Sequence, residues 1–151
     1  MRKIFSMILE ENNYKEVIDS YNQEDWQPLL DLIPRVESTP KFDVSGPLEI
    51  DDSGAIQIPH VKEVPVIEEF RKVVYEIPIM INFDWCSWDE GRSMARDETF
   101  NYDSVDIPTK CKLITAIVRN DRFCEGALSD AFESGLILKI LKSIQKQVDR
   151  V

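Results

Sequence analysis

The sequence predicts an α+β fold: a mostly helical single domain over residues 1–151, with a small antiparallel β-sheet and a three-helix C-terminal unit. Apolar residues recur at helical spacing along most of the chain, whereas apolar and polar residues alternate around a turn sequence near its middle. The last third carries three helical patterns joined by very short connections. A chain of 151 residues is long enough to bury one core, so we expect a single domain.

Helices are predicted throughout the first quarter of the chain. The initial segment MRKIFSMILEENN has too short an apolar run for a signal peptide, and its apolar residues share one helical face: Ile4, Phe5, Ile8 and Leu9. Residues 14–21 form a second helical pattern, which Asn12 or Asn13 can cap. Residues 23–37 form a third pattern, in which the first turn tolerates Pro28 and Pro34 disfavours continuation.

A β-hairpin is predicted in the middle of the chain. Apolar residues alternate around the turn sequence DDSG, with Leu48 and Ile50 before it and Ile56 and Ile58 after it. Gly54 can adopt the backbone conformation that such a turn requires. Two strands alone need cover, and the alternating segment 77–83 offers a third strand. Pro78 places that strand at a sheet edge or delays its start.

Two further helices are predicted on either side of the third strand. Residues 65–76 carry a clear apolar stripe behind Pro65, which is tolerated at an early helical position. After the strand, Ser87 and Glu90 match a capping box. A short helix is therefore expected to begin at Ser87, although Gly91 weakens it.

The C-terminal unit is predicted from three successive helices. Asp106 precedes the first helix, which ends near Asn120. Asp121 is expected to cap the second helix over residues 122–132, with Gly135 just past its end. The third helix presents four apolar residues to the core: Ile137, Leu141, Ile144 and Val148. Its opposite face is interpreted as solvated or, alternatively, as a contact for an acidic partner, and it carries Lys139, Lys142, Lys146 and Arg150.

The charge distribution limits the function. The net charge of −10 disfavours direct binding to nucleic acid. Residues 1–106 carry a net charge of −13 and residues 107–151 a net charge of +3. The basic third is therefore expected to pack against the acidic remainder or to lie beside it without consequence, with a dedicated anion-binding face as the alternative. A weaker hypothesis is that the acidic part of the chain mimics nucleic acid. A membrane span is not expected, because no apolar stretch reaches the roughly 18 residues that it requires.

Cysteine and histidine usage argues against a disulfide framework and against metal chemistry. The three cysteines lie far apart and form no CxxC pair, which is typical of proteins in a reducing compartment such as the cytoplasm. Cys124 is interpreted as a buried, inert thiol. His60 is the only histidine, so a metal site with two histidine ligands is excluded within one chain. The sequence also has no glycine-rich phosphate loop. We therefore expect neither a bound metal nor a cofactor.

Two segments resemble a known family. FDWCSW at residues 83–88 and the string CKLITAIVRNDRFCEGALSDAFESGLILKILKSI at residues 111–144 are similar to a small bacterial family known only as domain-of-unknown-function family 6508, with its FDW element and its RxDRFxEG and ESG signature. The resemblance implies a shared fold and brings no catalytic residues with it. It marks the matching positions as candidates only: Asp84, Trp85, Arg119, Asp121, Arg122, Phe123, Glu125, Gly126 and Gly135.

The signature contains the candidate for a ligand or anion site. In the structural interpretation, Asp121 caps a helix, Arg122 and Glu125 form a surface ion pair, and Phe123 faces the core. In the functional interpretation, Arg119 and Arg122 hold an anion while Asp121 or Glu125 moves a proton. Trp85 and Trp88, beside the predicted joint between strand and helix, form a ligand shelf with Asp84 or, more simply, anchor the core. The candidate site comprises six residues: Arg119, Asp121, Arg122, Glu125, Asp84 and Trp85.

The structural interpretation explains each chemical motif better than the functional one. We therefore expect a cytoplasmic bacterial protein that acts as a non-catalytic interaction or regulatory module, with a protein partner. The alternative is an enzyme or binding protein for an anionic small molecule, acting through Arg119, Asp121, Arg122 and Glu125. Enzymatic activity and self-association both stay undecided at the level of sequence.

Overall fold

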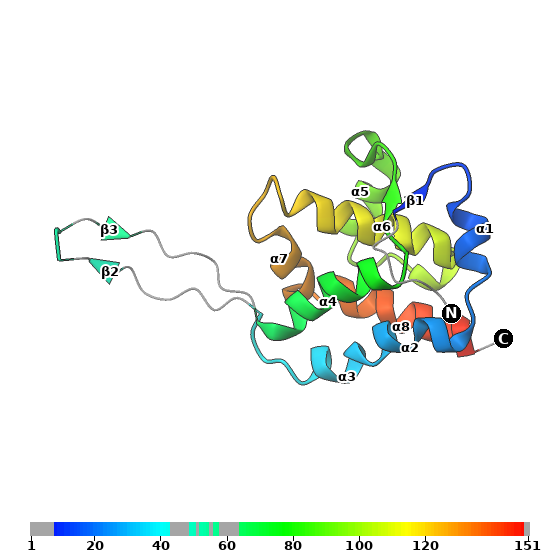
Figure 1. Cartoon of the computed structure of the whole chain (residues 1–151), viewed down its shortest axis with the longest axis horizontal. Coiled ribbons are helices and arrows are strands. Elements are labelled where there is room, and N and C mark those ends of the chain that lie inside the picture. The colour runs from blue at the N-terminus through cyan, green and yellow to red at the C-terminus, as the bar shows by residue number, and fades with distance from the viewer. Residues whose placement is uncertain (1–7, 43–48, 51, 55, 58–63, 150–151) are drawn as a thin grey trace.

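Helices make up most of the computed structural model, which describes residues 8–42, 49–50, 52–54, 56–57 and 64–149 (Figure 1). The helices are α1 (Tyr14–Asp19), α2 (Gln23–Leu30), α3 (Leu32–Glu37), α4 (Pro65–Glu76), α5 (Asp89–Arg96), α6 (Ile107–Asn120), α7 (Ala127–Glu133) and α8 (Leu136–Asp149), with 3-10 helices η1 (Trp85–Ser87) and η2 (Tyr102–Ser104). The strands are β1 (Leu9–Glu10), β2 (Glu49–Ile50), β3 (Ile56–Gln57) and β4 (Ile81–Asn82). None of the described helices is long and apolar enough to cross a membrane.

The core forms where α8 packs between α6 and the pair α2 and α3 (Figure 1). The apolar stripe predicted for α8 is confirmed, because all four of its residues are buried: Ile137, Leu141, Ile144 and Val148. The stripe predicted for α4 is confirmed as well, through Val66, Ile67, Phe70, Val73 and Val74. Burying each such side chain stabilises the fold by about 1.5–3 kcal/mol relative to leaving it in water. The amphipathic helices therefore supply the main driving force for folding.

The strands form two separate pairs instead of one antiparallel sheet. β2 and β3 pair antiparallel, with Glu49 opposite Gln57 and Ile50 opposite Ile56. β4, in the segment predicted as the third strand of that sheet, pairs with β1 in parallel, with Leu9 opposite Ile81. The prediction of a three-stranded antiparallel sheet is therefore wrong. The segment before β4 is buried on both sides, so its alternation does not mark a sheet with one solvated face: Ile79, Met80 and Ile81 are all fully buried.

The pairing of β1 with β4 also changes the start of the chain. The backbone N–H of Leu9 donates to the carbonyl of Met80 at 2.8 Å, so Leu9 belongs to a strand and the helix predicted across residues 4–9 is wrong there. Long-range hydrogen bonds to β4 outweigh the helical spacing of a few apolar residues. Several other residues used in the predictions lie outside the described part of the chain: Ile4, Phe5, Leu48, Asp51, Ile58, His60 and Arg150.

The helical pattern of residues 23–37 divides into two helices. α2 begins with a reciprocal capping box, in which Asn22 accepts from the backbone of Asp25 and the Asp25 carboxylate accepts from the backbone of Asn22. Pro28 therefore lies inside α2 and not in its first turn. Pro34 lies in the first turn of α3, where backbone N–H groups have no hydrogen-bond partner within the helix. The missing N–H of proline therefore costs no helical hydrogen bond, and α3 can form around it.

The lysine stripe of α8 contacts acidic parts of the same chain. Lys142 pairs with Glu37 at 3.2 Å, and Lys146 pairs with Asp103 at 3.3 Å. Lys139 donates to a backbone carbonyl at 3.2 Å. These contacts agree with the interpretation that the basic third packs against the acidic remainder. Exposed ion pairs of this kind contribute about 0–1 kcal/mol each, so they orient the surfaces more than they stabilise them.

Thr115 joins α6 to β4 inside the core. Its hydroxyl accepts from the backbone N–H of Ile81 at 3.2 Å and donates to the carbonyl of Cys111 at 2.8 Å. Thr115 is 0% exposed. Replacing Thr115 with Val keeps the shape but leaves the Ile81 N–H without its partner, so we expect a loss of about 1–3 kcal/mol in the free energy of unfolding. Urea denaturation measures this loss.

Amide hydrogen exchange at Ile81 provides the control for this substitution. Thr115→Val should accelerate exchange at Ile81, because the amide loses its acceptor. Thr115→Ser retains the hydroxyl and should keep Ile81 protected, even though the lost methyl group lowers stability. Equal protection of the Ile81 amide in the Val variant and in the native protein would show that the hydrogen bond to the Thr115 hydroxyl does not protect this amide.

Lys110 is a basic residue buried between α6 and α8. Its Nζ donates to Gln147 Oε1 at 2.7 Å, and the residue is 1% exposed. Burial lowers the pKa of Lys110 to about 8, against the opposing effect of Asp103 and Asp106, which favour its charged form. The native protein therefore releases this proton at a lower pH than the unfolded chain does.

Stability should consequently rise with pH where only the unfolded chain still holds the proton. The folded pKa is about 8 and a lysine in the unfolded chain has a pKa of about 10.4, so the unfolding free energy of the native protein should increase between these values relative to Lys110→Met. Urea denaturation at pH 7, 8.5 and 9.5 tests this. Parallel pH profiles for the two proteins would contradict the lowered pKa.

Candidate functional site

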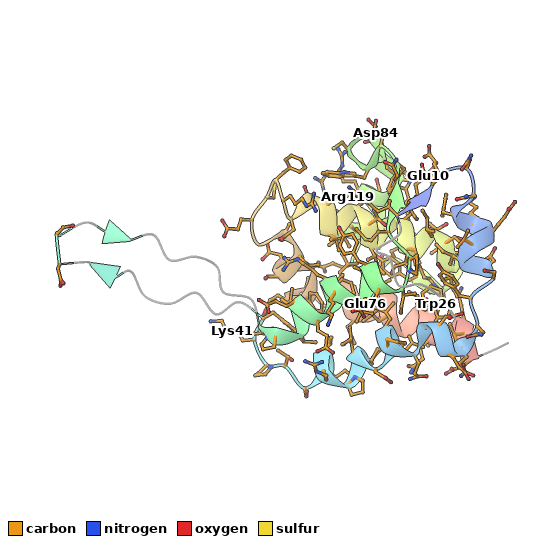
Figure 2. The ribbon with its side chains drawn as sticks, in the orientation of Figure 1. Glu10, Trp26, Lys41, Glu76, Asp84 and Arg119 are labelled. Atoms are coloured by element: carbon orange, nitrogen blue, oxygen red, sulfur yellow. The ribbon has the colours of Figure 1, made fainter. Side chains whose placement is uncertain are left out.

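A groove lies between α5 with η1 on one side and α6 on the other. In Figure 1, α5 lies next to α6 in the upper part of the molecule, and Figure 2 adds the side chains. The groove has a volume of about 620 Å³. Its lining comprises Trp85, Cys86, Trp88, Gly91, Arg92, Ala95, Arg96, Leu113, Ala116, Ile117, Asn120 and Phe123. Most of these side chains are apolar or aromatic.

The floor of the groove is one face of α6. Leu113, Ala116, Ile117 and Asn120 recur at a spacing of three or four residues, which places them side by side on a helix. The helix starts as predicted, because the Asp106 side chain accepts from a backbone N–H in the first turn at 2.9 Å. It also ends as predicted, at Asn120. The sequence therefore predicts the floor correctly, although not its exposure to a groove.

Trp88 and Gly91 determine the wall formed by α5. A Cβ atom on Gly91 would lie 2.2 Å from Cε3 of Trp88, so only glycine permits the indole ring to lie there. Trp88 occupies the N-cap position of α5, whereas Ser87 belongs to η1. The predicted capping box of Ser87 and Glu90 is therefore wrong. Packing of the Trp88 ring on the helix decides where α5 begins, and it outweighs the local capping preference.

A cation lies against the aromatic residues of this wall. The rings of Phe83 and Trp88 meet edge to face with their centroids 5.7 Å apart. The Nζ of Lys112, on α6, lies 4.8 Å from the centroids of both rings. A cation over an aromatic face contributes about 0.5–2 kcal/mol. Lys112 thus ties α6 to the α5 wall, a role that its place in the sequence does not indicate.

Phe123 lies at the end of the groove and is largely exposed. Its ring packs against Trp85 with the centroids 5.8 Å apart and the planes at 36°. Phe123 is 77% exposed, so the prediction that it faces the core is wrong. The reason is that residues 121–126 form a turn, because Gly126 adopts a left-handed conformation (φ 93°) and α7 begins only after it. Phe123 is consequently outside the helical pattern that predicted its burial.

Asp121 anchors this turn to the rest of the fold. Its Oδ2 accepts from Arg71 Nη2 at 2.5 Å, and its Oδ1 accepts from the backbone N–H of Leu128 at 3.0 Å. Asp121 follows the end of α6, and the N-cap of α7 is Gly126, so the prediction that Asp121 occupies the N-cap position is wrong, although its carboxylate does accept a backbone N–H in the first turn of α7. The predicted start of that helix at Arg122 is wrong, since α7 begins at Ala127. The predicted C-terminal boundary is confirmed, with Gly135 (φ 84°) just past the helix end.

The structure separates the other candidate residues from the groove. Arg119 is half-buried, and its Nε has no hydrogen-bond partner among the described residues. Arg122 and Glu125 are exposed, and the predicted ion pair between them does not form because they do not lie in a helix. Asp84 is exposed at the top of Figure 2, away from Arg119. Of the six candidate residues, Trp85 alone lines the groove.

The cysteines differ in their surroundings. Cys124 is exposed, so the prediction that its thiol is buried is wrong for the same reason as for Phe123. Cys86 is exposed and lines the groove. Cys111 is buried in the core, and burial raises the pKa of its thiol well above the usual range. Within the described residues, no group of three or more histidine, cysteine, aspartate or glutamate side chains could hold a metal ion.

Two arginines on α5 complete the groove, and the sequence predictions did not single them out. Arg92 donates to the backbone carbonyl of Cys86 and lies 3.7 Å from a carboxylate oxygen of Asp89, so its charge is already engaged. Arg96 is exposed and has no ion-pair partner in the part of the chain that the structure describes. Their spacing of four residues on a helix was the available signal, since such residues project from the same face.

The fold and the groove together define a small, mostly helical protein with an aromatic groove beside α6. The chain belongs to the family of unknown function DUF6508, whose model matches residues 21–150. This confirms the resemblance that the FDW element and the C-terminal signature indicate. The match includes both walls of the groove. Neither the curated proteins nor the solved structures that were compared include a match to the chain.

Two substitutions of Asp121 test how much its hydrogen bonds stabilise the fold. Asp121→Ala removes the acceptor of both Arg71 and Leu128, so we expect the free energy of unfolding to fall by about 2 kcal/mol, at the upper end for a lost helix cap. Asp121→Asn retains an oxygen that can accept from Leu128, and it should therefore lose less. Urea denaturation compares the two variants. If Ala and Asn were equally stable, the bond to Leu128 would not be the stabilising one.

Proposed function

We propose that this protein is a non-catalytic interaction or regulatory module of the cytoplasm, and that it binds its partner in the groove between α5 and α6. The observation that carries the proposal is the exposure of Phe123. This ring is 77% exposed at the end of an apolar groove and is held there by Trp85. An exposed aromatic side chain that continues an apolar concave surface enlarges the apolar area available to a ligand, which is typical of binding sites.

The composition of the groove supports binding. Tryptophan and arginine are the residue types that dominate the energetics of binding surfaces, and the lining contains Trp85, Trp88, Arg92 and Arg96. Apolar walls exclude water, while a few polar groups fix the orientation of what binds. The side-chain groups on the lining that can form hydrogen bonds are suited to recognition: guanidinium groups, indole N–H groups, an amide and a thiol.

A second candidate function is the binding or conversion of an anionic small molecule at the C-terminal end of α6. One observation favours it, namely that Nε of Arg119 is buried without a hydrogen-bond partner in the described chain. Arg122 lies three residues further on and is exposed. In this alternative Arg119 and Arg122 would hold the anion and Glu125 would be the acid or base, because Asp121 already accepts from Arg71 and from the α7 backbone.

A neutral fluorescent probe tests the groove as a binding surface. Nile red, which is apolar and uncharged, should bind the native protein and increase its fluorescence. Phe123→Ala should weaken this binding at least several-fold, because the variant removes the aromatic end of the groove. The melting temperature should change little, since substitution of a surface residue usually alters stability by no more than about 0.5 kcal/mol.

Ile8→Ala is the matched control. Ile8 is the other large apolar residue that is exposed in the described chain, at 42%, and it does not line the groove. It should leave Nile red binding unchanged. Equal weakening by the two substitutions, or no binding of the probe to the native protein, would refute the groove as the binding surface.

A further inference from the structure

We propose that the groove binds a small planar aromatic anion, with the aromatic ring against Trp85, Trp88 and Phe123 and the anionic group at Arg96. This inference rests on the proposed function, because it names the ligand class of the same groove. It is carried by the size of the groove, by the arrangement of its aromatic residues and by the charge of its lining.

The size of the groove favours a small molecule. Its volume of about 620 Å³ lies within the range of roughly 300–1,000 Å³ that is typical of small-molecule sites. A stable protein interface takes roughly 800 Å² from each partner, over a surface that is usually flatter. A ligand with one or two fused rings therefore matches the cavity better than a folded protein surface does.

The aromatic residues favour a planar ring. Aromatic rings attract each other in tilted or edge-to-face arrangements with centroids roughly 4.5–7 Å apart. Trp85 and Phe123 meet in this range, at 5.8 Å, and so do Phe83 and Trp88, at 5.7 Å. Rings from η1, from the start of α5 and from the turn after α6 thus approach one cavity. A planar ligand can add to this set of rings without displacing a core side chain.

The charge of the lining favours an anion. The chain as a whole carries a net charge of −10, yet the residues lining the groove include Arg92 and Arg96 and no aspartate or glutamate. Arg92 is engaged by Asp89 and by the carbonyl of Cys86. Arg96 has no ion-pair partner among the described residues, so its guanidinium can receive a carboxylate through two parallel hydrogen bonds.

Asn120 adds a neutral polar group to the floor of the groove. Its side-chain amide forms no hydrogen bond with the described residues, and it can donate to a carboxylate or accept from a ring substituent. Arg96 supplies the charge, whereas Asn120 supplies direction. The two residues come from different helices, α5 and α6, and both line the groove.

Isothermal titration calorimetry with four defined probes tests the ligand class. 2-Naphthoate should bind more tightly than 2-naphthamide, which has the same rings without the charge. It should also bind more tightly than cyclohexanecarboxylate, which has the charge without an aromatic ring, and than inorganic phosphate. Loss of a charged hydrogen bond weakens binding about tenfold or more, so the amide should bind weaker by that factor.

Arginine substitutions locate the anionic group. Arg96→Gln should weaken 2-naphthoate binding about tenfold or more and leave 2-naphthamide binding unchanged, because only the charged bond is lost. Arg122→Gln is the matched control, since Arg122 is also exposed and has no ion-pair partner in the described chain but does not line the groove. It should not change either affinity.

The outcomes separate this inference from the proposed function. If Nile red binds at the groove but naphthamide binds as tightly as naphthoate, the groove does not select for an anion. The inference about the anionic ligand is then refuted, while the groove stands as a binding surface. If Arg122→Gln weakens naphthoate binding and Arg96→Gln does not, the anion lies at the turn after α6 and the inference is overturned. If neither Nile red nor any aromatic probe binds, the proposed function fails together with the inference.

Discussion

The packing of α6 against the core is the constraint on which the rest of the structure depends. One side of this helix contacts α1, α7 and α8, and its Thr115 hydroxyl bonds the backbone of β4. The opposite side, with Ala116 and Asn120, forms the floor of the groove. Because one helix serves both surfaces, the floor of the groove is part of the packed core. A binding surface with a rigid floor loses little conformational entropy when it is occupied.

The walls of the groove depend on contacts that the helices alone do not specify. Gly91 admits the ring of Trp88, and Arg92 bonds the carbonyl of Cys86, so α5 and η1 hold each other. On the other side, Asp121 accepts from Arg71 and from the start of α7, which fixes the turn that carries Phe123. Asp121 was a candidate for moving a proton, and its bonds give it a structural task. The ring of Phe123 is thereby left exposed on a turn that Asp121 holds in place.

The parts of the fold that the sequence predicted correctly are those with local causes. Helices α1, α4, α6 and α8 follow from apolar residues at helical spacing, and Asp106 and Gly135 mark ends through bonds or backbone angles within a few residues. The family membership followed from a contiguous signature. For the candidate site, the sequence identified Trp85 but missed Arg92 and Arg96, because a charged pair on a short polar helix resembles any solvated face.

The sequence by itself therefore determined that α1, α4, α6 and α8 are helices, which of their faces are apolar and to which family the chain belongs. Only the tertiary structure decided that β1 pairs with β4, that Arg71 bonds Asp121 and that Phe123 is exposed. Arg71 and Asp121 are separated by 50 positions, and no pattern within one helix encodes such a contact. Helical spacing records how residues repeat along one segment, whereas a groove arises from how several segments meet.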